Sequence, residues 1–335
     1  MRKKEVFAGV FAMILSLGVI AIPVLVRFGA GNDTEIHARV AESGGWMPDV
    51  IKAKAGETLH LRLISDDVVH GFAVGQMPET EVDVEPGKVT EISVEFDQPG
   101  IYTYYCTRWC GLNHWRMRGT IEVSGDSPAY AQSDSKPLYV TLGIDLDAPH
   151  PAVAIPSQTP SASRGANAAS DLPDAYLSAD YYRAHSPAEA FSQLRAEPAM
   201  APLKDAQVWD LVAYIWRANT SGDEIIDGQS LYQANCAACH GEDGSGEGVF
   251  ADDLEEAGEA SMQSMQGAHD MMMQRPVDFT DPRQMHGASP ALLHGKITRG
   301  GMGTGMPMWG AIFSEAQIWD IIAYLYAFQF EGFTP

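Results

Sequence analysis

The stretch CTRWCGLNHWRM, residues 106–117, constrains this chain more than any other segment. It places Cys106 and Cys110 four residues apart, with His114 and Met117 close behind them. Thiolate and thioether sulfurs select copper among the common metals, and imidazole binds copper as well. A site for a single blue copper needs one Cys, whereas two Cys in the same loop can bridge two metal ions. The loop therefore predicts a binuclear copper centre.

This ligand set lacks a second imidazole, and His70 in DDVVHGFAV supplies it from an upstream strand. A structural zinc or a disulfide is the alternative for the two Cys. Zinc would take four Cys or His ligands in a closed tetrahedron, which leaves Met117 without a role. The predicted side-chain ligands of copper are His70, Cys106, Cys110, His114 and Met117.

The copper loop fits the pattern CxxxCGxNHxxM, and it follows an upstream VxHGF and the lead-in PGIYTYYC. These motifs resemble subunit II of haem–copper respiratory oxidases over residues 35–124. The resemblance implies a cupredoxin fold, a CuA centre and a sixth ligand, the backbone carbonyl of Arg108. Many members of that family carry Glu at this position. Because the ligand there is the carbonyl, the change to Arg108 has little consequence for copper.

The length and charge of the chain limit its function. Its 335 residues are enough for two or three domains. The 44 acidic residues exceed the 22 basic ones, so the formal charge is −22, which excludes a nucleic-acid partner. The acidic excess favours long-range attraction of a basic partner. The alternative, that it only solvates the surface, stays open.

The N-terminal residues are predicted to form a membrane anchor that is not cleaved. Residues 6–26 carry no charge, between the basic start MRKKE and Arg27, and this length can cross a bilayer as a helix. Positive charge at the start predicts a cytoplasmic N-terminus, with the rest of the chain outside. Glu5 lies at the cytoplasmic end. The family resemblance implies proton entry near this place, although an ordinary charge at a helix end is the alternative.

Residues 31–125 alternate apolar and polar side chains, which predicts an antiparallel β-sandwich. The clearest strand patterns are residues 60–65, 90–96, 101–106 and 119–123. The following residues, 126–174, are rich in Ser, Pro, Ala and Asn, a composition typical of linkers. Residues 138–144 interrupt this linker with an apolar run that is a candidate strand.

Residues 223–335 contain the motif CAACH, in which Cys236 and Cys239 can form thioethers with haem and His240 can bind iron. A chance CxxCH or a redox dithiol is the alternative. Ser221 and Glu224, and later Ser314 and Gln317, have the spacing of helix capping boxes. With the Gly- and Met-rich loop at residues 301–310, these features resemble a class I cytochrome c.

The second axial ligand of the haem iron is predicted to be a Met in GMGTGMPMWG. Met302, Met306 and Met308 compete for this role. The family ligand precedes a Pro, so Met306, which Pro307 follows, is the predicted ligand. Iron bound by His and Met has a raised potential suited to electron transfer.

An internal repeat lies upstream of the haem motif. Residues 206–216, AQVWDLVAYIW, match residues 316–326, AQIWDIIAYLY, at six of eleven positions. No CxxCH precedes the first copy. We therefore predict a haem-free cytochrome remnant at residues 175–222, with a helix over 206–218. Two unrelated amphipathic helices are the alternative.

A further stretch, residues 254–276, contains five Met and one His. Met-rich segments can bind Cu(I), which would suit copper delivery, although flexible Met more often fills apolar gaps. We treat this stretch as an insertion in the haem domain.

These features predict a multi-domain protein with a transmembrane helix, an all-β cupredoxin sandwich and an all-α cytochrome c domain. The domain boundaries are 1–30 for the anchor, 31–125 for the CuA domain, 126–174 for the linker, 175–222 for the remnant and 223–335 for the cytochrome c. The resemblance is to subunit II of a cytochrome c oxidase with a fused cytochrome c. It implies an oxidoreductase subunit in a prokaryotic plasma membrane, with its domains on the periplasmic side.

The resemblance also implies the partners. The chain would take electrons from a basic cytochrome or a blue-copper protein and pass them to the oxidase catalytic subunit I. The same module in a nitric oxide reductase, or a copper-binding assembly protein, is the alternative.

Overall fold

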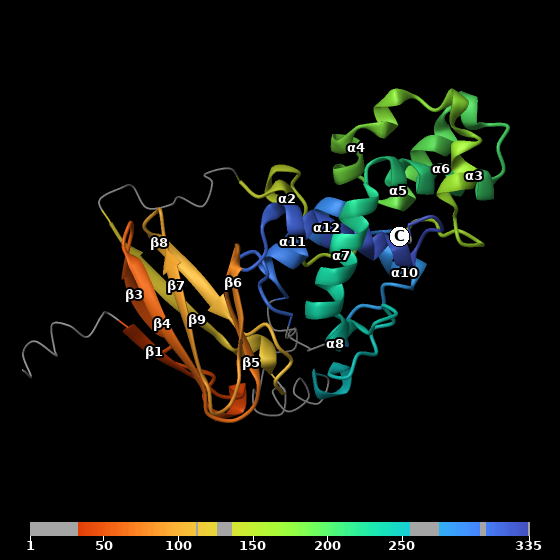
Figure 1. Cartoon of the computed structure of the whole chain (residues 1–335). Coiled ribbons are helices and arrows are strands. Elements are labelled where there is room, and N and C mark those ends of the chain that lie inside the picture. The colour runs from red at the N-terminus through yellow and green to blue at the C-terminus, as the bar shows by residue number, and fades with distance from the viewer. Residues whose placement is uncertain (1–32, 112, 126–135, 255–274, 302–305, 334–335) are drawn as a thin grey trace, which may run out of the picture. The chain divides into compact units, whose positions relative to one another are not determined.

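Figure 1 shows the computed structural model, which describes residues 33–111, 113–125, 136–254, 275–301 and 306–333. These residues form two compact units. The first contains the described residues up to 73 and from 79 to 125, and the second contains 74–78 and the residues from 136 on. Residues 1–30 and Glu5 lie outside the described part. Within the described part, no helix is long and apolar enough to cross a membrane.

The first unit consists of two β-sheets. The four-stranded sheet has the order β2 (Trp46–Met47), β1 (Asp33–Ala38), β4 (Thr58–Ser65) and β7 (Val89–Glu95). The five-stranded sheet has the order β3 (Val50–Lys54), β9 (Arg118–Ser124), β8 (Gly100–Tyr105), β5 (His70–Val74) and β6 (Met77–Val84).

These strands confirm the four strand patterns, but the sandwich is mixed rather than antiparallel. β1 pairs with β4, and β3 with β9, in parallel. The sequence prediction was wrong on this point because alternation identifies strands but not which strands pair, and both parallel pairs join strands that are not consecutive along the chain. The alternation of apolar residues still sets the core, since Leu59, Leu61 and Leu63 of β4 are all buried.

The second unit is helical. Its longer helices are α5 (Pro187–Ala196), α6 (Asp205–Ala218), α7 (Gly222–Asn235), α11 (Pro290–Arg299) and α12 (Glu315–Leu325). Its shorter helices are α2 (Leu138–Thr141), α3 (Ala162–Ala166), α4 (Ala179–Ala184), α8 (Ala237–His240) and α10 (Pro282–Met285).

Helix starts in this unit follow from side-chain caps. Ser221 with Glu224 starts α7, and Ser314 with Gln317 starts α12, each as a complete capping box. α6 confirms the helix predicted over residues 206–218. Its apolar face is fully buried, including Trp209, Val212, Ala213 and Trp216.

Residues 136–174, which we predicted to be linker, belong to the second unit over their whole described length. The candidate strand at 138–144 begins as helix α2, whose Tyr139 ring lies against Gly295 of α11. A four-residue helix is too short to leave a periodic pattern in the sequence, so the apolar run at 138–144 was taken for a candidate strand. Most of the Met-rich stretch, residues 255–274, lies outside the described residues.

Candidate metal centres

The predicted copper ligands lie at the ends of three neighbouring strands. His70 is the first residue of β5, Cys106 follows the last residue of β8, and Met117 immediately precedes β9. Because β9, β8 and β5 are adjacent in one sheet, the hydrogen-bonded backbone fixes the spacing of these ligands. His114 lies between them in a short 3-10 turn, His114–Arg116.

The structure brings all five predicted side chains together. The sulfurs of Cys106 and Cys110 are 3.9 Å apart. The Nδ1 atom of His70 lies 3.8 Å from Cys106 Sγ, and the Nδ1 atom of His114 lies 3.6 Å from Cys110 Sγ. The Sδ atom of Met117 lies 3.2 Å from Cys110 Sγ. Each end of the sulfur pair therefore has its own imidazole.

The predicted sixth ligand also faces the site. The carbonyl oxygen of Arg108 lies 3.3 Å from Cys106 Sγ. The guanidinium points elsewhere, because its Nε donates to Asp83 Oδ1 at 2.7 Å. The backbone and side chain of Arg108 thus serve different contacts, and a ligand role for the carbonyl stays a prediction.

The glycine after His70 allows the copper loop to approach β5. A Cβ atom on Gly71 would lie 2.0 Å from Thr107 Oγ1. Real Cβ atoms do not approach so closely, so any larger residue would displace the loop from His70. The VxHGF motif therefore needs its glycine for packing.

Asp67, which the sequence analysis missed, holds His70 from behind. Its Oδ1 lies 2.7 Å from His70 Nε2, which leaves Nδ1 free toward Cys106. The backbone N–H groups of Val40 and Val68 donate to the same carboxylate, each at 2.7 Å. Carboxylates in this position fix the tautomer and direction of a metal-binding imidazole. The signal was the acidic pair immediately upstream of VVH.

The His70 side of the site is buried and the His114 side is nearer the surface. The His70 side chain is fully buried, and Trp46 packs beside it with ring centroids 6.3 Å apart. Trp46 also fixes the loop, since its Nε1–H donates to the Met117 carbonyl at 3.1 Å. On the other side, the Trp109 ring lies 4.5 Å from the His114 ring and is 36% exposed.

The electrostatics suit a cation. Hydrogen bonds from Cys110, His114 and His70 lower the pKa of the Cys106 thiol to about 3, although burial opposes this. Burial lowers the pKa of His70, but its hydrogen bonds to Cys106 and Asp67 outweigh burial and raise it. The hydrogen bond to Cys106 and burial raise the pKa of Cys110, so the pair readily carries one negative charge, on Cys106. A metal ion would compensate that charge and displace the remaining proton.

This donor set fits binuclear copper better than the alternatives. The two thiols are free, and 3.9 Å is far beyond the roughly 2 Å of a disulfide. His70, Cys106 and Cys110 could hold one metal ion, since their ligand atoms lie within 4.8 Å of one another. Zinc would not use the Met117 thioether, which lies against Cys110, whereas copper would.

The haem motif lies at the end of α7 and in α8. Cys236 caps α7, and Cys239 and His240 are the last residues of α8. Both thiols are free. The Nδ1 atom of His240 lies 3.2 Å from the Val277 carbonyl oxygen, and Phe279 stacks on the ring at 4.6 Å. Because Nδ1 is engaged by this carbonyl, Nε2 is the ring nitrogen that would bind a haem iron.

The pKa values here disfavour a redox dithiol. Burial raises the pKa of Cys236 to about 12 and that of Cys239 to about 11. Reactive dithiols instead have lowered pKa values. Burial also lowers the pKa of His240 to about 4, so its imidazole is neutral at pH 7 and can bind iron. The residues present therefore fit a covalent c-type haem.

The structure narrows the choice of the Met that would be the second axial ligand of the haem iron. The Met306 side chain is half-buried, and its carbonyl oxygen accepts from the Gly301 N–H at 3.2 Å. Met308 is 54% exposed, which disfavours it as an iron ligand. Met302 lies outside the described residues, so the choice of Met306 over Met302 stays a prediction.

Comparison with known protein families agrees with both sites. Residues 49–124 match the family model for cytochrome c oxidase subunit II, periplasmic domain, and residues 225–328 match the model for cytochrome c. The chain is thus similar to the periplasmic domain of cytochrome c oxidase subunit II in one part and to cytochrome c in another. The first family implies CuA copper and the second implies haem, and both donor sets are present.

Individual relatives match part of the chain. Cytochrome c oxidase subunit 2 of Thermus thermophilus is 38% identical over 79 residues, which cover 24% of this chain and 58% of that relative. A second Thermus thermophilus protein of the same name, from another strain, is also 38% identical over 79 residues, covering 46% of its length. The probable cytochrome c oxidase subunit 2 of Rickettsia bellii is 35% identical over 66 residues, covering 20% of this chain and 24% of its own. The match thus spans about half of the Thermus relatives.

Two solved structures are similar to part of the chain. A chain of a heme-copper terminal oxidase dimer has a TM-score of 0.25 at 24% identity, covering 36% of this chain and 99% of that one. The periplasmic domain of subunit II of the Bradyrhizobium japonicum cytochrome oxidase has a TM-score of 0.25 at 18% identity. The match covers 29% of this chain and 86% of that one.

Proposed function

We propose that this protein is the electron-transfer subunit of a membrane haem–copper oxidase. It would receive electrons from an external donor at the cytochrome c domain and pass them through the copper domain to a catalytic subunit I, where oxygen is reduced. The chain would lie in a prokaryotic plasma membrane, with the N-terminus cytoplasmic and both domains outside. Bound CuA and c-type haem would each supply reversible one-electron chemistry.

The presence of a copper donor set and a haem-attachment motif in one chain carries this proposal. The copper donors are rigidly held, because three adjacent strands, Asp67 and Trp46 fix their positions. Such a site rearranges little when its charge changes, which favours rapid electron transfer. An assembly protein that delivers copper needs ligands that release the ion, and a buried His70 held by a carboxylate does not suit release.

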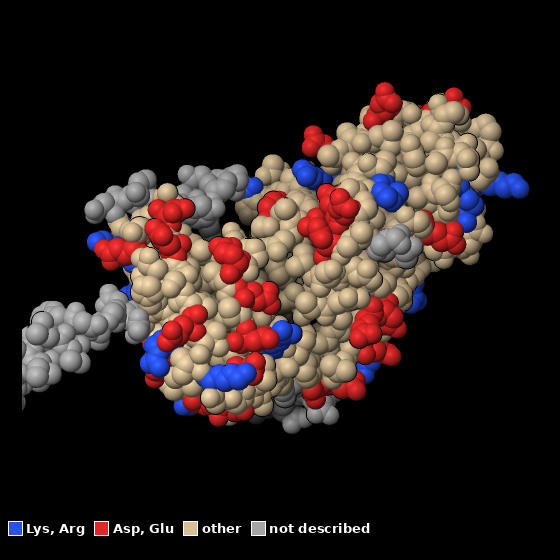
Figure 2. Space-filling model, viewed as in Figure 1, with Lys and Arg blue, Asp and Glu red and all other residues tan. Residues whose placement is uncertain are grey.

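The protein's charge supports a basic donor. The net charge is −22, and Figure 2 shows Asp and Glu side chains spread over the visible surface. This charge attracts a basic cytochrome or blue-copper protein over a distance of about 8 Å at physiological salt. It therefore acts on the rate of encounter more than on affinity.

The test is purification of the native membrane complex. We expect two coppers and one covalent haem in this chain, together with a partner subunit that reduces oxygen. If the catalytic partner reduces nitric oxide and not oxygen, the complex is a nitric oxide reductase, and this chain is its electron-transfer subunit. Copper that a mild chelator removes from the folded protein would support an assembly role and contradict the proposal.

A further inference from the structure

The helical unit contains two copies of one helix arrangement. We call residues 221–333 the haem-binding repeat and residues 160–220 the haem-free repeat. α5 and α11 occupy the same place in each, and both start at the Ser of a Ser-Pro-Ala sequence, Ser186 and Ser289. α6 and α12 carry the matching segments 206–216 and 316–326.

The first helix of each repeat packs on the last helix through a glycine. A Cβ atom on Gly228 of α7 would lie 1.9 Å from the Asp320 carbonyl oxygen of α12. A Cβ atom on Gly165 of α3 would lie 2.0 Å from the Asp210 carbonyl oxygen of α6. Asp210 and Asp320 hold the same position in the two matching segments. α3 is therefore the counterpart of α7, and the haem-free repeat begins inside the predicted linker.

The haem-attachment helix also has a counterpart. α8 begins nine residues after Gly228, and the 3-10 helix Asp174–Leu177 begins nine residues after Gly165. In this alignment Tyr176 stands at the position of Cys239, and Leu177 at that of His240. Residues 178–185 then lead to Ser186, where the haem-binding repeat has residues 241–288. The haem-free repeat thus lacks both the attachment residues and most of the chain that follows them in the haem-binding repeat.

Internal stacking agrees with this alignment. Phe191 of α5 stacks on Trp209 of α6 at 4.5 Å, with an interplanar angle of 12°. His294 of α11 stacks on Trp319 of α12 at 4.6 Å and 28°. Phe191 and His294 each lie five residues after the capping Ser, and the two Trp match in sequence.

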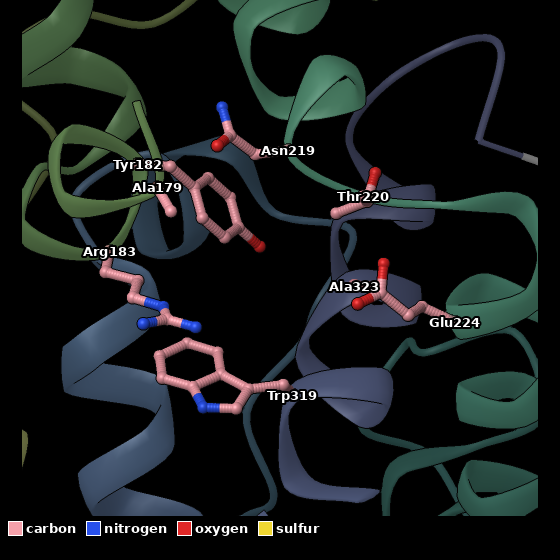
Figure 3. Close-up of a pocket in the computed structure, with 8 residues that line it drawn as sticks. All are labelled: Ala179, Tyr182, Arg183, Asn219, Thr220, Glu224, Trp319 and Ala323. Carbon is pink, nitrogen blue, oxygen red and sulfur yellow. The ribbon is translucent and has the colours of Figure 1, made fainter. Parts of the chain in front are cut away.

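Contacts between the repeats are reciprocal. Trp209 of the haem-free repeat packs on His286 of the haem-binding repeat, with ring centroids 4.9 Å apart. The matching contact has the two repeats exchanged: Trp319 of the haem-binding repeat packs on Arg183 of the haem-free repeat. The Cζ atom of Arg183 lies 4.8 Å from the centroid of the Trp319 ring (Figure 3). Arg183 and His286 each lie three residues before the capping Ser. Such exchange of partners is the property of a two-fold interface.

The axis of this symmetry passes close to one aromatic pair. Trp216 and Tyr326 match in the two repeats, and their rings contact each other at 5.9 Å. Equivalent residues meet each other only near a two-fold axis. Both side chains are fully buried.

The symmetry is broken at one position on each side of the axis. Phe330, four residues after Tyr326, packs against His286 at 5.5 Å. The matching residue of the haem-free repeat is Thr220, four residues after Trp216. Thr is too small to fill this space, and a cavity of about 50 Å³ lies there, lined by Thr220, Tyr182, Arg183, Glu224 and Trp319 among others (Figure 3).

We infer that residues 160–220 form a second, haem-free cytochrome c-type repeat that packs on the haem-binding repeat as the other half of a pseudo-two-fold pair. The face of the haem-binding repeat around His286, Tyr326 and Phe330 is thus an interface for a second cytochrome unit, and the haem-free repeat occupies it. Its role is to cover and stabilise that face. The pairing does not depend on the electron route proposed above.

The test uses full-length holoprotein, with thermal unfolding followed by haem absorption, which reports on the haem-binding repeat. Trp216→Ala should lower the midpoint by about 10 °C, since removal of a buried Trp is among the costliest core changes. Tyr181→Ala is the control for a half-buried ring outside the interface, because this ring packs on Tyr176 and His185 inside the haem-free repeat. Tyr181→Ala should lower the midpoint temperature of unfolding, as followed by haem absorption, by less than half as much.

Two further variants keep the test decisive if Trp216→Ala does not fold. Trp216→Tyr copies the matching residue Tyr326 and should unfold within about 3 °C of wild type. Arg183→His copies His286 and should also be tolerated, whereas Arg183→Asp, which cannot stack on Trp319, should lower the midpoint. The inference would be overturned if the midpoint temperature of unfolding, followed at the haem, stayed unchanged in Arg183→Asp and in every folded Trp216 variant. Two separate unfolding transitions for the two repeats would also overturn it.

Discussion

Asp67 shows at the scale of one residue how the fold prepares a metal ligand. Its carboxylate is fixed by two backbone N–H groups and in turn fixes the His70 imidazole, so the ring direction does not depend on a metal. Burial opposes ionisation, but hydrogen bonds from His70, Val40 and Val68 outweigh it and lower the pKa of Asp67. The ligand itself was predictable from the motif, whereas its support came from a residue with no motif of its own.

Asp67→Asn should weaken copper binding about 10- to 100-fold, the usual effect of removing a carboxylate behind a metal-binding His. Copper affinity is measured by competition with a chelator of known strength. Asp66→Asn is the control, because Asp66 pairs with His37 and Arg39 instead. Equal loss of affinity in the two variants would show that Asp67 acts through general charge, and not through His70.

Cys110→Ser should abolish the binuclear centre, because two bridging thiolates are needed to share one electron equally over two coppers. Copper content should fall from two per chain, and the spectrum should change to that of localised copper. Haem content should stay the same in this variant, whereas Cys239→Ser should disturb haem and leave copper intact. A wild-type protein that binds a single copper when fully loaded would contradict the assignment.

Met306→Ala should remove the absorption band of the Met–iron bond and lower the haem potential, because the thioether ligand raises that potential. Met302→Ala should retain the band. The opposite result, with the band lost in Met302→Ala and kept in Met306→Ala, would transfer the ligand role to Met302.

At the scale of helices and strands, local patterns predicted most of the architecture. The alternation in residues 60–65 and the capping boxes at Ser221 and Ser314 depend on neighbours in sequence, and the structure confirms them. α3 could not be predicted in this way. It has five residues, and its place is set by Gly165 against Asp210, a contact between positions far apart in the chain. The parallel pairing of β3 with β9 was hidden for the same reason.

The contact between α7 and α12 predicts a pH dependence. Burial, with Glu224 and Asp227 of α7 nearby, raises the pKa of Asp320 from 3.8 to about 6 in the folded protein. A carboxyl group with a raised pKa favours the folded state while protonated. The free energy of unfolding should therefore fall as pH rises from about 4 to about 6, and level off above.

Asp320→Asn should flatten this slope, as measured by denaturant unfolding of holoprotein followed at the haem between pH 4 and 7. Asp223→Asn, a change in the first turn of α7 at an exposed residue, serves as the control and should keep the slope. A slope of unchanged size in Asp320→Asn would assign the pH dependence to other groups.

At the scale of the whole molecule, the chain joins a copper domain and a haem domain covalently. Such a connection raises the effective concentration of one site near the other without any added affinity. Under the proposed function, the acidic excess would act on an external donor, whose encounter should slow as salt screens the charge. Transfer within the chain should depend little on salt, because covalent connection and not charge attraction keeps the domains together.

Rapid mixing of the loaded protein with a reduced basic cytochrome, at several salt concentrations, tests this account most directly. We predict that the haem is reduced first and copper second, that rising salt slows the first step, and that the second step changes little. In a variant that cannot attach haem, Cys236→Ala with Cys239→Ala, copper reduction should be much slower. Reduction of copper before haem, or at an unchanged rate in that variant, would contradict electron entry through the cytochrome c domain.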